Sequence, residues 1–286
     1  MSIFQSLIAE SPVMKEKLDI AARIAQTDSP VFLLGEAGVG KELFARYIYS
    51  KSKRSEQKFV HINCLKEDTD FLDLFHGTLT VFFDEISCLT LLRQQALLDA
   101  FKKKSGDIRI ISSTKHDIEQ MIAEGAFLRE LYYKLNVLPI FIPPLRDRKE
   151  DILTLASYFL KNFAFEIKKD IGDFDGEAQE ALIAHPWNGN VRELRNMVER
   201  ASLNSDAPLI YKKDLFVYNE SAYYSKIGEG GYDLKRAVNA FKAFFLEKVL
   251  ETARGNQTAA AKMLGIQRTY LSKLIKDLQI RSCSKT

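Results

Sequence analysis

The chain has 286 residues, which exceeds one small domain, and we expect it to fold as two or three. Its 46% of hydrophobic and 28% of charged residues are typical of a globular protein and exclude a disordered or fibrous chain. No apolar run approaches the roughly 18–20 residues that cross a bilayer, and the first residues do not resemble a signal peptide, so we expect no membrane partner. Three scattered cysteines (Cys64, Cys88 and Cys283) fit neither a disulfide framework nor a zinc site and indicate a reducing, cytoplasmic location.

Charge is unevenly divided along the chain. Residues 232–286 hold eleven Lys and Arg against four Asp and Glu, an excess of +7, so the other residues carry −4 of the overall +3. A basic C-terminal tail on a mildly acidic body is the footprint of a nucleic-acid-binding module. A lysine-rich helix surface exposed to water gives the same count, so charge alone leaves both interpretations open.

The first half, residues 1–148, alternates short apolar segments with helical ones. This alternation predicts the α/β class, a parallel sheet with helices on both faces. Over residues 149–210 the pattern becomes wholly helical, residues 211–231 read as a linker, and residues 232–286 form a compact helical unit. The expected strands are Val31–Leu34, Phe59–Ile62, Val81–Phe83, Ile108–Ile111 and Leu138–Ile142.

A glycine-rich turn, called the P-loop below, follows the first expected strand and opens a helix over Glu42–Tyr49. Glycines let successive backbone N–H groups point at phosphate oxygens, and the helix N-terminus adds a favourable dipole. Lys41 would reach the β- and γ-phosphates of ATP, as in a Walker A motif. An ordinary glycine-rich turn is the alternative, but strand, spacing and helix together favour a nucleotide site. Its residues are Gly35, Glu36, Ala37, Gly38, Val39, Gly40, Lys41 and Glu42.

Two carboxylates follow the expected strand Val81–Phe83. In the Walker B arrangement Asp84 holds Mg²⁺ and Glu85 polarises the attacking water. Strand ends are often polar, so two carboxylates alone are weak evidence for a Walker B motif. The P-loop upstream makes this evidence strong. We therefore expect ATP and Mg²⁺ as cofactors, with Asp84 and Glu85 as catalytic residues.

These motifs resemble the AAA+ domain of the bacterial enhancer-binding proteins, the sigma-54-dependent activators. The family's Walker A reads GESGTGKE, so Glu42 matches it although the general pattern has Ser or Thr. The segment FVHINC resembles the one whose asparagine restrains the catalytic glutamate, which implies that role for Asn63. The segment WNGNVREL is similar to the family's WPGNVREL in a helical lid, which implies that Arg192 senses the nucleotide. A further match is PPLRDR at residues 143–148.

One departure from the family concerns its contact with the sigma factor. The activators carry a GAFTGA loop between the Asn-Cys segment and Walker B, and only Asp73–Thr80 precedes Val81 here. The loop and its flanking helices are missing, so we expect that the chain does not remodel the sigma-54 holoenzyme itself. We also expect no receiver or ligand-sensing domain of the kind that most relatives carry at the N-terminus.

Three further positions argue against rapid hydrolysis. The family motif FRxDLYYRL supplies two arginines that act on a neighbour's γ-phosphate, and the matching positions hold Leu128 and Lys134, with Arg129 one place after the first. Lys115 stands where the family has the asparagine of its first sensor. Lysine cannot reproduce the planar grip of arginine, and loss of an arginine finger costs on the order of 10³–10⁵ in rate. We expect nucleotide binding with weak or absent turnover.

The C-terminal segment predicts a helix-turn-helix. An alanine-rich helix ends at Gly265, and a second helix follows over Gln267–Leu278. Small alanines let two helices cross closely, and the glycine accommodates the reversal. The segment resembles the Fis-type helix-turn-helix of the same family, which implies double-stranded DNA as a partner. The expected DNA contacts are Gln267, Arg268, Thr269, Tyr270, Ser272, Lys273 and Lys276.

The preceding helix, Leu234–Thr252, holds more large apolar residues than a small helix-turn-helix covers. Packing within the domain is one explanation; we favour a homodimer or higher homo-oligomer, because Fis-type units pair on two half-sites. The apolar residues are Val238, Phe241, Phe244, Phe245, Val249 and Leu250.

The favoured function is a DNA-binding transcription regulator whose AAA+ domain responds to ATP. Its partners would include RNA polymerase or a related full-length activator. Two alternatives stay open at this point: an ATPase that remodels a partner through a different contact, and a DNA-binding scaffold with a vestigial nucleotide site.

Overall fold

The computed structural model describes residues 7–66, 77–103, 106–215 and 256–278, with single positions between 239 and 253. The chain divides into two compact units, one up to Leu215 and one from Phe216 onward. Within the described ranges, no helix is both long and apolar enough to cross a bilayer.

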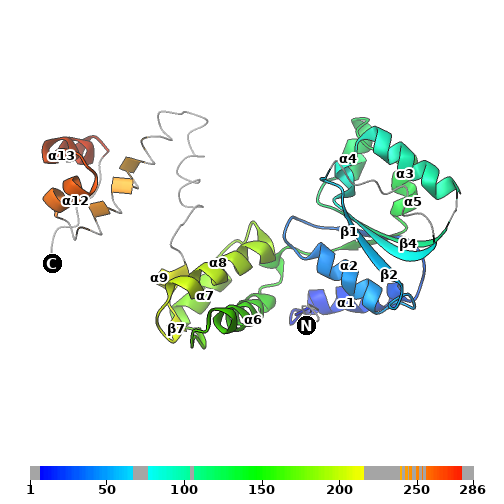
Figure 1. Cartoon of the computed structure of the whole chain (residues 1–286), viewed down its shortest axis with the longest axis horizontal. Helices are drawn as coiled ribbons and strands as arrows, with labels where there is room; N and C mark the ends of the chain where they lie inside the picture. Colours follow the sequence, from blue (N-terminus) through cyan, green and yellow to red (C-terminus); the bar gives the residue numbers. More distant parts are fainter. Residues whose placement is uncertain are drawn as a thin grey trace. The chain divides into compact units, whose positions relative to one another are not determined.

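A five-stranded parallel sheet forms the centre of the first unit (Figure 1). The strand order is β2-β3-β4-β1-β5, so β1 lies between β4 and β5 and pairs with both. The predicted parallel sheet is confirmed, because all its strand pairs are parallel. Each expected apolar run lies in one strand, except that Ile142 follows the end of β5. The strands are β1 (Val31–Leu34), β2 (Lys58–Asn63), β3 (Gly77–Asp84), β4 (Gly106–Thr114) and β5 (Leu138–Phe141).

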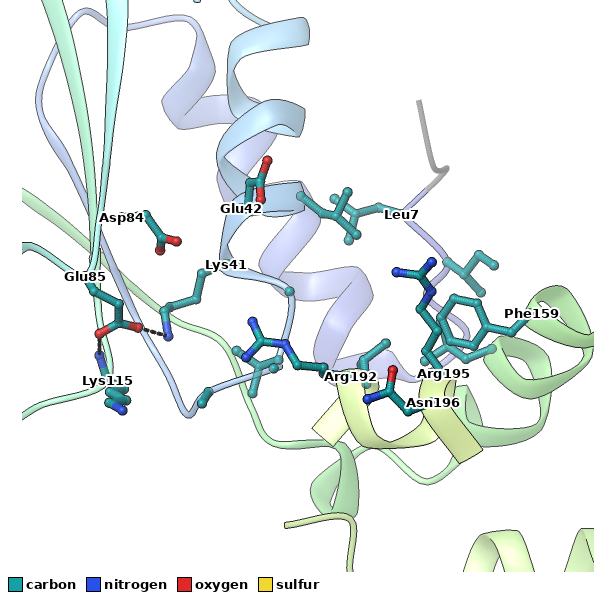
Figure 2. A pocket seen from close by; sticks show the side chains of 18 of the residues that line it. Leu7, Lys41, Glu42, Asp84, Glu85, Lys115, Phe159, Arg192, Arg195 and Asn196 are labelled. Atoms are coloured by element: carbon teal, nitrogen blue, oxygen red, sulfur yellow. Dashed lines mark hydrogen bonds and ion pairs between the residues drawn. The ribbon is translucent and has the colours of Figure 1, made fainter. Parts of the chain in front are cut away.

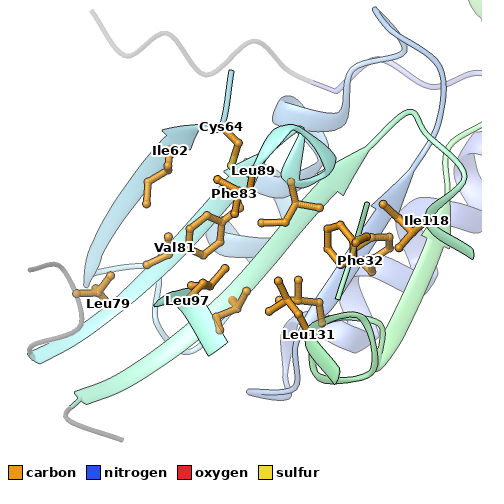
Figure 3. Close-up of a cluster of buried hydrophobic side chains, with 14 residues drawn as sticks. Phe32, Ile62, Cys64, Leu79, Val81, Phe83, Leu89, Leu97, Ile118 and Leu131 are labelled. Atoms are coloured by element: carbon orange, nitrogen blue, oxygen red, sulfur yellow. The ribbon is translucent and has the colours of Figure 1, made fainter. Parts of the chain in front are cut away.

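Each face of the sheet buries its own apolar cluster under helices. Phe32 and Phe83 point to the face covered by α3, α4 and α5, where Leu97 of α3 is fully buried (Figure 3). Leu33 and Phe82, their neighbours in sequence, point to the face covered by α1 and α2. Strands covered on both faces need apolar residues at successive positions, which explains the unbroken apolar runs. The helices are α1 (Pro12–Ala25), α2 (Lys41–Ser50), α3 (Leu91–Lys103), α4 (Ile118–Ala123) and α5 (Arg129–Leu135).

A lid of helices follows the 3-10 turn η3 (Leu145–Asp147). The prediction that it is wholly helical was wrong in one place, because β6 (Asp173–Phe174) and β7 (Leu209–Ile210) pair as a short parallel ladder. Two-residue strands are too short to give a periodic signal in the sequence. Helix α9 (Lys212–Leu215) packs against α7 and α8, so the lid extends past the boundary expected at residue 210. The longer lid helices are α6 (Glu150–Ile167), α7 (Gly176–Ala184) and α8 (Asn190–Asn204).

A buried carboxylate joins the lid to the start of the α/β subdomain. Asp151, in the first turn of α6, is fully buried and accepts hydrogen bonds from the backbone N–H groups of Glu10 (2.6 Å) and Ser11 (2.7 Å). The Ser11 hydroxyl donates to the other carboxylate oxygen of Asp151, at 2.9 Å. The buried Arg148 lies 4.0 Å from the same carboxylate and donates to the carbonyl oxygen of Val39 in the P-loop at 2.8 Å. One ion pair therefore links the lid, the start of α1 and the P-loop.

The second unit contains the expected helix-turn-helix. Helix α12 (Gln257–Met263) is followed by α13 (Arg268–Asp277), and Gly265 between them has a φ of +64° that suits glycine. The small side chains of Ala260 and Ala261 are buried against the apolar stripe of α13, as predicted. That stripe consists of Leu271 and Ile275, both buried, with Leu274 and Leu278 packed beside them.

Part of the helix expected over 234–252 packs on the same cluster. Leu246 and Leu250 are buried there, and Val249 packs against it. Phe245 is 49% exposed, whereas Val238, Phe241 and Phe244 lie outside the described residues. Packing within the domain therefore accounts for some of the apolar residues, and the dimer interface stays a prediction.

We predict that Asp151→Ala lowers the free energy of unfolding by about 3–5 kcal/mol, because the buried Arg148 loses its ionic partner. Chemical unfolding of the full chain would measure this loss. Asp206→Ala is the control, since the Asp206 side chain is 97% exposed beside Lys169, and we expect less than about 1 kcal/mol for that change. Equal losses in the two variants would contradict the role assigned to Asp151.

Candidate functional site

Polar residues gather where the carboxyl ends of the parallel strands meet. Asn63 ends β2 opposite Asp84, which ends β3; Glu85 comes next, and Lys115 follows β4. The P-loop follows β1 at the same edge. Ligands of open α/β sheets bind at this edge. A cavity of about 450 Å³ opens there, lined by these residues, by most of the P-loop and by the lid (Figure 2).

The P-loop has the shape that an anion requires. Gly38 and Gly40 have φ values of +79° and +105°, in the left-handed region that favours glycine. Gly40 is the N-cap of α2, and no side chain caps that helix end. The N–H groups of the first turn are therefore available to phosphate oxygens, and the helix dipole favours their negative charge.

Lys41 begins α2, and its side chain is only 6% exposed. Its ammonium donates to the carbonyl oxygens of Gly35 (2.9 Å) and Glu36 (3.2 Å) and pairs with Glu85 Oε1 at 2.9 Å. The Walker A lysine and the Walker B glutamate are thus in direct contact.

Asp84 is held by two neighbours. The Ser113 hydroxyl donates to Oδ1 at 2.7 Å, and His61 Nε2 lies 3.8 Å from Oδ2. Burial raises the pKa of this carboxyl, but the nearby His61, the hydrogen bond from Ser113 and the Lys41 charge outweigh it, so the net pKa is lowered. Asp84 is therefore ionised at neutral pH.

The residues present fit a magnesium ion that arrives with a nucleotide. Mg²⁺ is usually held by one or two carboxylates together with substrate phosphates, and Asp84 supplies one ionised carboxylate. Glu42 accepts two hydrogen bonds from Arg46, at 3.0 and 2.9 Å, and also faces His61 Nδ1 at 3.5 Å. Across the described ranges, no group of three His, Cys, Asp or Glu side chains could hold a metal by itself. Asp84 would hold the ion, which would neutralise phosphate charge.

Glu85 has a left-handed backbone, with φ of 56°, and both carboxylate oxygens are engaged. The Lys41 ammonium forms an ion pair with Oε1, and the backbone N–H of Lys115 donates a hydrogen bond to Oε2 at 3.2 Å. Asn63, expected to restrain this glutamate, instead accepts a hydrogen bond from the Leu65 N–H at 3.0 Å. Its side chain lines the same cavity, and its restraining role stays a prediction.

The lid contacts the P-loop through Asn190. Its amide donates to Glu36 Oε2 and to the carbonyl oxygen of Ala37, both at 3.0 Å, and its own carbonyl oxygen accepts the Leu145 N–H at 2.8 Å. Arg146 donates hydrogen bonds from Nη1 and Nη2 to the two carboxylate oxygens of Glu36. Hydrogen bonds from Arg146 and then Asn190 lower the pKa of Glu36 to about 2.

Gly38 meets the same turn of the lid. A Cβ at this position would lie 2.3 Å from the carbonyl oxygen of Gly189, so only glycine allows the approach. The Val191 N–H donates to the Gly38 carbonyl oxygen at 3.0 Å. Trp187 anchors the turn, because it is fully buried and donates from Nε1 to the Leu182 carbonyl oxygen at 2.8 Å.

The lid also supplies two arginines and an apolar wall. Arg192 and Arg195 line the cavity from α8, and Arg192 extends toward Lys41 (Figure 2). The nucleotide-sensing role of Arg192 stays a prediction. The end beyond them is lined by Leu7, Ile8 and Phe159, among others. Sequence reasoning did not identify this apolar end, and the only signal for it was a pair of apolar residues shortly before α1.

The positions that match the family's arginine fingers lie on α5. Leu128 is its N-cap and is partly buried, with its N–H donating to Gln94 Oε1 at 2.8 Å. Arg129 and Lys134 are exposed on that helix. None of the three lines the cavity of its own chain.

The DNA-binding candidates that the structure describes are all exposed in the second unit. Gln267, Arg268, Thr269 and Tyr270 are all exposed at the start of α13, and Ser272 and Lys273 are exposed in the next turn. Ser272 donates to Gln257 Oε1 at 3.1 Å, so part of its hydroxyl is used within the fold. The side chain of Lys276 lies outside the described set.

Three domain families match the chain in succession. Residues 8–145 match the Sigma-54 interaction domain, residues 146–226 match the AAA+ ATPase lid domain, and residues 245–277 match the Bacterial regulatory protein, Fis family.

Relatives and a solved structure agree with these matches. The chain is 34% identical to the regulatory protein AtoC of Escherichia coli K12, over 96% of this chain and 68% of AtoC. It is also 34% identical to the uncharacterized protein in the HyuA 5′ region of Pseudomonas sp. NS671, over 90% of this chain and 99% of that protein. The crystal structure of NtrX from Brucella abortus in complex with ADP superposes with a TM-score of 0.67 at 28% identity, covering 96% of this chain and 69% of NtrX. The NtrX complex with ATP gives 0.66 at the same identity.

Proposed function

The chain belongs to the family of sigma-54-dependent transcription regulators, and from this premise we propose that it binds ATP at the P-loop, hydrolyses it slowly or not at all, and does not open sigma-54 promoters itself. It has the AAA+ domain, the lid and the Fis-type helix-turn-helix of a DNA-binding regulator of this family.

Nucleotide binding is supported by the geometry of the P-loop. The Gly38 and Gly40 conformations, the uncapped start of α2 and the buried Lys41 ammonium form a phosphate site. NtrX, at 28% identity, was solved with ADP and with ATP. An incoming phosphate would replace Glu85 as the partner of Lys41, and Asp84 would hold the accompanying Mg²⁺.

Slow turnover is supported by the absence of arginine at the two positions where the family has its arginine fingers. Transfer of a γ-phosphoryl group depends on positive charge around its equatorial oxygens, and a neighbour's arginine commonly supplies it. Leu128 occupies one of the two arginine-finger positions, and its side chain is uncharged. Lys134 occupies the other, and its ammonium lacks the planar two-nitrogen grip of arginine.

The observation that carries the sigma-54 part of the proposal is the link between β2 and β3. These strands are parallel neighbours, and residues 64–76 connect them. Adjacent parallel strands need a connection of roughly a dozen residues or more. The link is therefore close to the minimum length and has no residues to spare for a projecting loop with its own helices.

A second candidate function is favoured by the intact carboxylates. Asp84 and Glu85 stand where an ATPase needs them, which suits an enzyme that remodels a transcription partner through another contact. In either case we expect a cytoplasmic regulator that binds double-stranded DNA as a homodimer or larger homo-oligomer, with RNA polymerase or a full-length relative as a partner.

We predict that Lys41→Ala weakens ATP and ADP binding at least tenfold, because a charged hydrogen-bond donor to the phosphates is lost. Calorimetric titration of the full chain with Mg²⁺ would measure this. Lys58→Ala is the control, since Lys58 is exposed at the opposite end of β2. If the unmodified chain binds neither nucleotide at millimolar concentration, the site is vestigial and the proposal fails.

In a purified open-complex assay with sigma-54 RNA polymerase, we predict that the chain with ATP yields no open complexes above background. A standard activator of the family serves as the positive control on the same promoter. ATP-dependent open complexes formed by the chain alone would show that the short β2–β3 link does not prevent the sigma-54 contact.

For DNA, we predict that Arg268→Ala costs about 1–3 kcal/mol on the specific site and much less on random DNA. The reason is that Arg268 is exposed at the start of α13, the helix that we expect to enter the major groove. Lys262→Ala is the comparison, since this exposed lysine lies on α12 and would contact phosphates only. Affinities on both DNAs would be measured at one fixed salt concentration. A specific-to-random ratio that Arg268→Ala leaves unchanged would mean that α13 does not read the sequence through this residue.

A further inference from the structure

Ser113, near the end of β4, contacts both residues that follow the apolar part of β3. Its side chain is fully buried, and its hydroxyl donates to Asp84 Oδ1 at 2.7 Å. The same oxygen accepts the backbone N–H of Glu85 at 3.2 Å. A serine hydroxyl has a single proton, and because the Glu85 N–H is the donor on one side, that proton points at Asp84 on the other. One side chain therefore holds the Asp84 carboxylate and the backbone of the next residue.

The parallel register of β3 and β4 brings this hydroxyl to the carboxylate. Phe83 pairs with Ser112. One residue further along the two strands, Asp84 lies beside Ser113. Successive side chains alternate between the faces of a strand, so Ser112 points to the opposite face, where its buried hydroxyl donates to the carbonyl oxygen of Val31 at 3.4 Å. Of these two adjacent buried serines, Ser113 is the one that contacts Asp84.

A second pair of hydroxyls holds the turn that follows Glu85. Thr114 donates to Ser87 Oγ at 3.0 Å, and both side chains are buried. This contact keeps the turn beside β4 without help from Ser113. We therefore expect loss of the Ser113 hydroxyl to change how the Asp84 carboxylate is oriented, while the turn stays in place.

The orientation of Asp84 matters for a magnesium ion that arrives with a nucleotide. Asp84, Glu85 and Lys41 lie together at one end of the cavity (Figure 2), and Asp84 is the carboxylate that would hold the ion. A hydrogen bond to an ionised carboxylate is roughly twice as strong as one between neutral groups. A carboxylate held in this way keeps one orientation, and loss of such a partner typically lowers metal affinity by about 10–100-fold.

From these contacts we infer that Ser113 is a positioning residue, which orients the Asp84 carboxylate for the Mg²⁺ of a bound nucleotide and so sets the affinity of the site for that ion. The inference rests on the proposed nucleotide binding and adds which side chain makes that binding respond to magnesium. Ser113 is not among the residues that line the cavity, so it acts through Asp84 and not on the nucleotide itself.

The test measures how the affinity for a non-hydrolysable ATP analogue depends on Mg²⁺ concentration, by calorimetric titration of the full chain. We expect Ser113→Ala to raise the Mg²⁺ concentration of half-maximal effect about tenfold, and to change the affinity measured with a metal chelator less than about twofold. Ser113→Thr keeps a hydroxyl on a β-branched residue that suits a strand, and it should respond to Mg²⁺ as the unmodified chain does. Because Ser113 acts through Asp84, adding Ser113→Ala to Asp84→Ala should change the magnesium response no further.

Ser112→Ala is the matched control, because it removes the neighbouring buried hydroxyl, and the magnesium response should stay as in the unmodified chain. Melting temperatures of all variants would show that the fold is kept. If Ser113→Ala shifts the magnesium response no more than Ser112→Ala, or weakens binding equally with and without Mg²⁺, Ser113 does not position Asp84 and the inference is wrong. It is also wrong if the unmodified chain binds the analogue with no response to Mg²⁺. If the unmodified chain does not bind the analogue at all, it is the proposed nucleotide function that fails.

Discussion

The nucleotide site depends on the close contact between the lid turn at residues 189–191 and the P-loop. Gly38 has no room for a Cβ because the Gly189 carbonyl oxygen occupies that space, and the next N–H of the turn, from Val191, bonds the Gly38 carbonyl oxygen. Asn190 then ties Glu36 and Ala37 to the lid through one amide group. These contacts hold the start of α8 against the P-loop, and Arg192 and Arg195 line the cavity from that helix.

The buried Asp151–Arg148 pair also helps to hold the P-loop and the lid together. Both charges are removed from water, so their position is retained only because the Ser11 and Glu10 groups and the Val39 carbonyl complete their hydrogen bonds. The P-loop is thus held by Asn190 at Glu36 and Ala37 and by Arg148 at Val39. Preorganisation of this kind reduces the ordering cost of binding phosphates.

Local patterns in the sequence predicted the sheet and the P-loop well. The five strands follow from unbroken apolar runs, and the P-loop follows from glycines placed where the backbone must be left-handed. Asp84 and Glu85 were found in the same way, because they directly follow a buried strand. The alanines and Gly265 of the helix-turn-helix are likewise local signals.

Contacts between distant residues could not be predicted. Asp151 and Ser11 are 140 positions apart, and nothing near either residue in the sequence indicates the other. The Lys41–Glu85 pair joins two motifs whose separate roles were clear but whose mutual contact was not. Lys115 was interpreted as a departure from the family's first sensor, and the hydrogen bond from its backbone N–H to Glu85 was not foreseen. The β6–β7 ladder was missed because two residues give no period.

The central claim is that the site binds ATP but lacks the cations that make hydrolysis fast. The most direct measurement is the turnover rate of the full chain at saturating ATP and Mg²⁺, over a range of protein concentrations, with bound nucleotide quantified in the same samples. We expect full occupancy with turnover below about 10⁻² s⁻¹ at every concentration, since loss of an arginine finger costs on the order of 10³–10⁵ in rate. Turnover of about 1 s⁻¹ or more, rising with protein concentration as a ring assembles, would contradict the claim.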